Sequence, residues 1–146
     1  MNASSLQELK NHYRESGART GVKLDDYEMQ QAISLLPLEG TVVATPPAEL
    51  RYIEGLLRLP IGTVREFSAI PASGQSQCRC GRTTNALDIV AHAVNHRLHD
   101  ESFVRDAVIG VHNVFEFADE GRTAPCHQCG REFTARSYWT HAYLYA

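Results

Sequence analysis

Four cysteines, arranged as two doublets, constrain this sequence more than any other feature. The first doublet is Cys78-Arg-Cys80, the second is Cys126-His-Gln-Cys129, and Gly-Arg follows each of them. Zinc prefers four ligands in a tetrahedron, and thiolates are its usual ligands at structural sites. The glycine after each doublet permits a positive φ, so that backbone amides can point at the sulfurs. The pattern predicts one zinc ion bound by Cys78, Cys80, Cys126 and Cys129.

Other uses of these cysteines stay open at the level of sequence. Four thiolates can also hold an iron–sulfur cluster. Two disulfides are disfavoured, because Cys78 and Cys80 are too close in the chain for an easy local bridge. Cys126-x-x-Cys129 also begins like a C2H2 finger with His141 near the first histidine position, but the second histidine is missing.

Pro125-Cys-His-Gln-Cys129 matches the P-C-x-x-C half of the zinc-deaminase signature. The other half is a His-x-Glu or Cys-x-Glu upstream that supplies the general-acid glutamate. We identify no such upstream half in this sequence, and we therefore expect no deaminase site.

A helix predicted from Thr83 or Thr84 to about Leu98 carries several polar residues along one flank. His92 and His96 are four residues apart, a spacing at which two imidazoles can share a metal, and Asp88 could orient His92. Either histidine could therefore replace a cysteine as a zinc ligand or act as an acid–base catalyst. A polar edge to the apolar core explains the same residues more simply.

A strand predicted from Val111 to Phe117 places His112 and Glu116 on the same side, where they could form a base–acid pair. The candidate catalytic residues are therefore His92, His96, His112 and Glu116. The sequence has no phosphate loop, nucleophile elbow or dinucleotide fingerprint that would assign a reaction.

The remaining pattern predicts an α+β fold of N-terminal helices and a small antiparallel sheet, with a four-cysteine zinc-knuckle site clasping the C-terminal half. Helices are expected after the capping-box spacing of Ser5 and Glu8, from Asp25 or Asp26 to Pro37, and from Pro46 to Leu59 with Leu50, Ile53, Leu56 and Leu57 buried. Another helix is expected from Glu101 to Ile109, capped by Asp100 and ended by Gly110 in a left-handed conformation. The segment from Thr63 to Ile70 is predicted to form a strand.

The length of 146 residues predicts a single domain. Within it, residues 1–70 form a helical or αβ part and residues 71–146 the zinc-binding part. No run of about 18 apolar residues occurs and the N-terminus lacks a secretory signal, so we expect a cytoplasmic protein with no membrane partner.

A net charge of −3 disfavours a general nucleic-acid coat protein. We therefore expect a small zinc-binding protein whose structural zinc supports a protein-interaction or regulatory surface. One alternative is a small enzyme that uses His92, His96 or His112 in a pocket near the zinc. A second alternative is a protein that binds nucleic acid through its zinc knuckles and local arginines.

Overall fold

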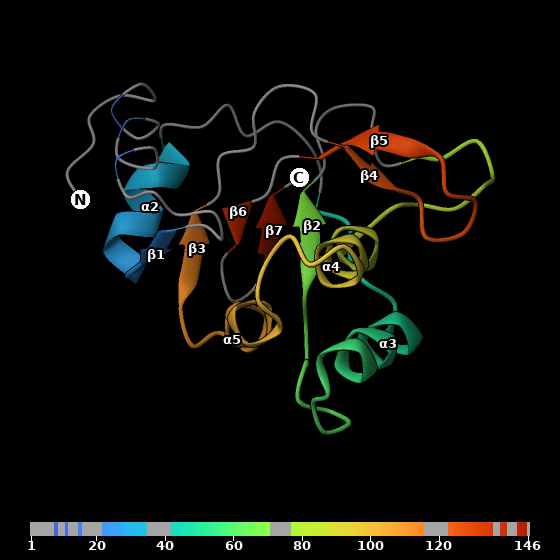
Figure 1. Ribbon diagram of the computed structural model, residues 1–146, viewed down its shortest axis with the longest axis horizontal. Coiled ribbons are helices and arrows are strands. Elements are labelled where there is room, and N and C mark those ends of the chain that lie inside the picture. Colours follow the sequence, from blue (N-terminus) through green and yellow to red (C-terminus); the bar gives the residue numbers. More distant parts are fainter. Residues whose placement is uncertain are drawn as a thin grey trace.

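Figure 1 shows the computed structural model, which describes residues 8, 11, 15, 22–34, 42–70, 77–115, 123–135, 138–139 and 143–145. In chain order its elements are β1 (Val22–Leu24), α2 (Asp26–Ser34), α3 (Pro47–Leu57), β2 (Ser68–Ile70), α4 (Ala86–Asn95), α5 (Glu101–Ile109), β3 (Asn113–Phe115), β4 (Thr123–Pro125), β5 (Glu132–Thr134), β6 (Tyr138–Trp139) and β7 (Tyr143–Tyr145). No helix in these residues is long and apolar enough to cross a membrane.

The larger sheet has five strands in the order β1-β3-β6-β7-β2. Neighbouring strands of this sheet run antiparallel except for β7 and β2, which run parallel, with Ala69 opposite Leu144. The strands lie side by side across Figure 1, and the separate β4–β5 hairpin lies beyond the β2 edge, next to α4. The predicted α+β class with a small antiparallel sheet is confirmed for the described residues, with one parallel pair in addition.

The apolar core joins the two halves of the chain. Helix α3 buries the predicted face of Leu50, Ile53 and Leu57, and α4 packs against it with Leu87 and its neighbours. Phe67, before β2, and Leu144, in β7, complete this core. Burial of large apolar side chains is the main favourable term in folding, so residues from both ends of the sequence stabilise the same core.

Helix boundaries follow local capping groups. Helix α5 begins after Asp100 and ends at Gly110, whose φ is 90°, as predicted, although the Asp100 side chain makes no capping hydrogen bond. The N-cap of α4 is Asn85, so the prediction of Thr83 or Thr84 is wrong. The side chain of Asn85 accepts a hydrogen bond from the amide of Leu87 at 2.8 Å, which an N-cap asparagine does as well as a threonine.

The strand predicted from Thr63 is shorter than expected and begins at Ser68. The buried amide of Val64 donates to the carboxylate of Glu54 at 2.8 Å rather than to a neighbouring strand. A backbone amide that donates to a side chain is no longer available to pair with a neighbouring strand.

Several predicted features lie outside the described residues. Of the expected N-terminal helix only Glu8, Asn11 and Glu15 are described, and all three are helical. The end of the second helix before Pro37 and the end of the strand that includes Glu116 also fall outside the described part.

Glu54 is the buried charge that fixes the connection from α3 to β2. It is 1% exposed, and its carboxylate lies 2.6 Å from the Arg51 guanidinium. Burial alone would raise the pKa of Glu54, but backbone hydrogen bonds from Val64 and its two preceding residues, with the charge of Arg51, hold it below the usual value. The ionised form of Glu54 therefore stabilises the fold.

We expect Glu54→Gln to lower the free energy of unfolding by about 2–3 kcal/mol at pH 7, because the substitution removes a charge that three backbone donors and Arg51 stabilise. The folded-state pKa of Glu54 is depressed, so this contribution is complete above the usual pKa of 4.5 and is lost as the pH falls through the folded-state value. Urea unfolding at pH 7 and below pH 4 measures both effects.

The exposed Glu66→Gln is the matched control and should change the free energy of unfolding by less than about 0.5 kcal/mol. Equal effects of the two substitutions would contradict the role assigned to Glu54.

Candidate metal centre

The structure brings the four cysteine sulfurs together. All four Sγ atoms lie within 4.8 Å of one another, and among the described residues they are the group of histidine, cysteine and acidic side chains that could hold a metal ion. Two of these separations cross between the doublets, at 3.5 Å for Cys78 and Cys129 and 3.7 Å for Cys80 and Cys126. All four are free thiols.

These separations match the edges of a tetrahedron around one ion. A Zn–S bond of about 2.3 Å places tetrahedral sulfurs about 3.8 Å apart. A disulfide would require sulfurs about 2.05 Å apart. The thiols therefore have the spacing of ligands to a single ion and not of disulfide partners.

The same loop is built twice, as residues 78–82 (the first cysteine loop) and residues 126–131 (the second cysteine loop). The amide of Cys78 donates to the carbonyl of Arg82 at 2.9 Å, and the amide of Cys126 donates to the carbonyl of Arg131 at 2.8 Å. The glycine before each arginine has a positive φ, 95° in the first loop and 79° in the second. Glycine adopts this conformation without steric cost, which explains the repeated Cys-Gly-Arg sequence.

Backbone groups within the loops also act on the sulfurs. A hydrogen bond from the backbone of Cys80, helped by neighbouring thiols, lowers the pKa of Cys78 to about 7. The backbone of Arg82 acts to lower the pKa of Cys80, but burial and the neighbouring cysteines raise it to about 12. The backbone of Arg131 likewise acts to lower the pKa of Cys129, which the Cys78 thiol and burial raise overall. The Cys78 thiol therefore ionises more readily than the thiols of Cys80 and Cys129.

A buried carboxylate connects both loops to helix α4. Asp88 is 1% exposed, and Oδ1 accepts from the Arg82 Nε at 3.1 Å and from the His127 amide at 2.7 Å. Its Oδ2 accepts from the Arg82 Nη2 at 3.0 Å and from the Asn85 amide at 2.8 Å. Asp88 therefore contacts the first loop, the start of the helix and the second loop.

Helix α3 contributes a second carboxylate to this network. Glu49 accepts from the Arg82 guanidinium and, at 3.4 Å, from the side-chain amide of Asn85. The Arg82 side chain is only 13% exposed, and its ion pairs with Asp88 and Glu49 raise its pKa further above the ordinary value. The Tyr52 ring, also on α3, meets the His127 ring edge-on at a centroid distance of 5.0 Å.

These hydrogen bonds of Asp88 do not support the possibility that it orients His92. Asp88 occupies the third position of α4, where its carboxylate turns back to the Asn85 amide in a capping box instead of facing the next turn. The Asn-x-x-Asp spacing before an apolar run was the sequence signal for this arrangement. Nothing local in the sequence indicates the contact of Arg82 with Glu49 or that of Asp88 with the His127 amide.

Two predicted histidines lie together but apart from the sulfur group. The rings of His92 and His96 are 4.5 Å apart, and His96 is exposed at the end of α4. Within the described residues no histidine belongs to the group that could hold a metal. The predicted exchange of a cysteine for one of these histidines therefore finds no support there.

His112 belongs to a different part of the molecule. Its ring packs 5.2 Å from Phe103, which in turn stacks on His99 at 5.8 Å. Glu116 and His141 lie outside the described residues, so the pairing of His112 with Glu116 stays a prediction.

The sequence does contain a His-x-Glu, at His99-Asp100-Glu101, which the expectation against a deaminase overlooked. The structure separates it from the sulfurs. His99 is buried beside Phe103 and Trp139, and the carboxylate of Glu101 lies 3.5 Å from the Arg58 guanidinium. His99 is absent from the group that could hold a metal in the described residues, so the deaminase ligand set is not formed.

A family model described as "Domain of unknown function (DUF8243)" matches residues 13–146. No curated protein and no solved structure matches the chain. The family match contains both cysteine loops, Asp88 and Glu49, so the whole network described above lies within the family's own boundaries. Because the match covers more than half of the sequence, the chain belongs to the DUF8243 family.

Proposed function

We propose that this chain is a zinc-binding module in which one zinc ion, held by Cys78, Cys80, Cys126 and Cys129, is structural and supports an interaction surface. The observation that carries this proposal is the gathering of the four Sγ atoms within 4.8 Å of one another. Tetrahedral coordination by four thiolates is one of the usual forms of a structural zinc site.

The compactness of the sulfur group favours one ion over an iron–sulfur cluster. A cluster binds its cysteines through different iron atoms, with inorganic sulfide between them, so the thiolates stand farther apart. The separations of 3.5 Å and 3.7 Å leave room for one metal atom. Zinc is the expected occupant because it combines tetrahedral geometry with a preference for thiolates.

Four thiolates also argue for a structural role over a catalytic one. They fill the tetrahedron, so no position is left for water or substrate. With four ionised thiolates the site would carry a net charge of about −2, which weakens the metal as a Lewis acid.

The position of the site shows what such a metal would hold. It joins two loops that are 46 to 51 residues apart in sequence, at the start of α4 and at the end of the β4–β5 hairpin. Asp88 makes a second connection between the same loops. Zinc and carboxylate together would fix the hairpin to the helical core, and the energy of metal binding would then add to the stability of the fold.

We assign the interaction surface to the exposed side of α3 beside the second cysteine loop. We infer that its partner is a protein. Tyr52 is 48% exposed there and contacts His127, and Ile61, after the helix, is 86% exposed. Aromatic side chains of this kind are enriched at protein interfaces. A basic nucleic-acid face is less consistent with the described ion pairs, because Arg51, Arg58 and Arg82 already contact carboxylates.

We expect one zinc and no iron per chain by elemental analysis of the purified protein. Removal of zinc with a strong chelator should lower the melting temperature by about 10 °C or more, because the site contributes folding energy. Cys126→Ser should lose the metal as well. Stoichiometric iron would contradict zinc, and an unchanged melting temperature after complete removal would contradict a structural role.

Zinc binding should release at least two protons per ion at pH 7. The raised pKa values of Cys80 and Cys129 keep both thiols protonated without metal, and both must ionise to act as ligands. Zinc affinity should accordingly fall as the pH is lowered. Calorimetric titration of the metal-free chain in buffers of different ionisation enthalpy counts the protons, and release of none would show that these thiols are not ligands.

Asp88→Asn should weaken zinc affinity by about 10- to 100-fold, because Arg82 loses its anionic partner and the new amide presents N–H groups to backbone donors. The same substitution should lower the free energy of unfolding of the zinc-loaded chain by about 2–3 kcal/mol. Competition with a chromophoric chelator measures the affinity. Asp106→Asn, on α5 away from both loops, should retain wild-type zinc affinity; an equal loss would remove the specific role of Asp88.

A further inference from the structure

A pocket of about 300 Å³ opens beside the sulfur group. It is lined by Gln77, Cys78, Arg79 and Thr84 on the side of the first doublet and by Arg131, Glu132 and Phe133 on the side of the second. The two walls come from segments about 50 residues apart that meet where Cys78 approaches Cys129. The pocket therefore depends on the assembled cysteine site, and the inference below rests on the proposed function to that extent.

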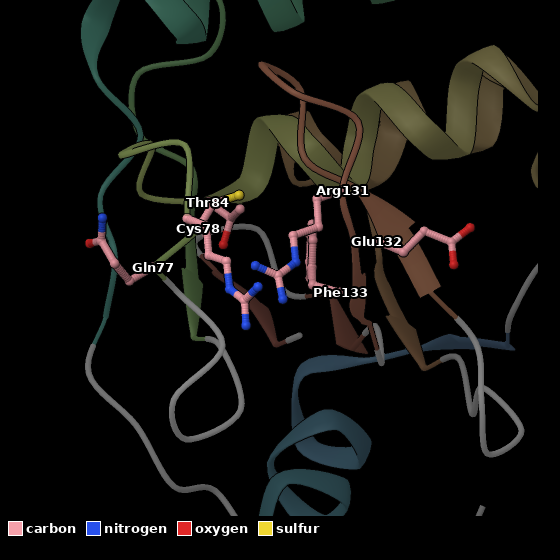
Figure 2. Close-up of a pocket in the computed structure, with 7 residues that line it drawn as sticks. Gln77, Cys78, Thr84, Arg131, Glu132 and Phe133 are labelled. Carbon is pink, nitrogen blue, oxygen red and sulfur yellow. The ribbon is translucent and has the colours of Figure 1, made fainter.

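Two exposed arginines give the pocket its charge. Among the described residues neither Arg79 nor Arg131 has a carboxylate within ion-pair distance, whereas Arg82, at the equivalent place of Arg131 in the first loop, has two. The one acid in the lining does not neutralise them, because Figure 2 shows the Glu132 carboxylate pointing away from the Arg131 guanidinium. Arg131 points toward the side of Cys78 and Thr84. The opening thus presents two available guanidinium groups.

Neutralising the metal site does not use up the hydrogen-bond donors of these two arginines. A zinc ion with four thiolates has a formal charge of about −2, which two nearby arginines offset. Each guanidinium carries five N–H donors in a planar fork, so one edge can face the sulfurs while another binds an oxyanion. Phosphate is one of the two groups, with carboxylate, that such a fork binds in bidentate fashion.

The size and the apolar wall restrict what carries the phosphate. A volume of about 300 Å³ is much larger than a bare phosphate and lies at the lower end of the range for small-ligand sites. Phe133 lines the same pocket. An aromatic ring provides a stacking face for a planar base, and such stacking tolerates any base.

We propose that this pocket binds a nucleotide, with the phosphate between Arg79 and Arg131 and the base against Phe133. A free mononucleotide and the 5′-phosphorylated end of a single strand share this chemistry. The metal holds the two walls together, so nucleotide binding depends on zinc.

The test is a calorimetric titration of the zinc-loaded full chain with AMP, with adenosine and inorganic phosphate as fragments. AMP should bind, and each fragment should bind at least tenfold more weakly, because each uses only part of the pocket. A short 5′-phosphorylated RNA and its unphosphorylated form distinguish the two sources. If the RNA binds more tightly than AMP, and only when it is phosphorylated, the ligand is the strand end. If the RNA and AMP bind with equal affinity, the ligand is the free nucleotide.

Arg131→Ala and Arg79→Ala should each lower AMP affinity at least tenfold with zinc content unchanged. Arg65→Ala is the control, since it removes the same charge from an exposed position outside the pocket lining. Absence of AMP binding to the zinc-loaded chain at millimolar concentration overturns the inference and leaves the metal site standing. Loss of zinc from both pocket variants overturns it too, because the arginines would then serve as counter-ions of the thiolates. A chain that never holds zinc refutes the proposed function first.

Discussion

The buried carboxylate of Asp88 is the interaction on which the arrangement around the cysteines depends. A carboxylate that is removed from water costs several kcal/mol unless charged and hydrogen-bonded partners replace the solvent. Asp88 meets this requirement with the Arg82 guanidinium and two backbone amides, one from Asn85 and one from His127. Each partner belongs to a different segment, so satisfying one carboxylate fixes the first cysteine loop, the start of α4 and the second cysteine loop relative to one another.

This arrangement explains why the four sulfurs converge. The thiols of each doublet are placed locally by a glycine-containing loop, but a metal site needs the two loops to face each other at the distance of a zinc–sulfur tetrahedron. Asp88 holds the loops from the side of the helix, and a metal would hold them from the side of the sulfurs. Glu49 extends the same network to α3, so the proposed zinc, the α3 surface and the arginine-lined pocket all depend on one set of contacts.

Features that depend on neighbours in sequence were predicted well. The apolar face of α3 follows from periodicity, the end of α5 from Gly110, and the Cys-Gly-Arg loops from their spacing. Errors arose where a distant group intervened. The strand expected from Thr63 begins only at Ser68, because the amide of Val64 donates to Glu54. Asp88 contacts both cysteine loops, whereas the sequence had suggested a contact with His92 on the same helix.

The sequence alone determined which residues gather as candidate metal ligands and how each loop is folded, because hydrogen bonds within five or six residues are encoded in spacing and in glycine. Only the tertiary structure decided what the two Gly-Arg sequences do. Arg82 is held in ion pairs with Asp88 and Glu49, while Arg131 lines an open pocket, although the local sequences are alike. The difference comes from partners 33 and 39 residues away, Glu49 for Arg82 and the His127 amide for Asp88, and contacts at that separation form only when the helices pack.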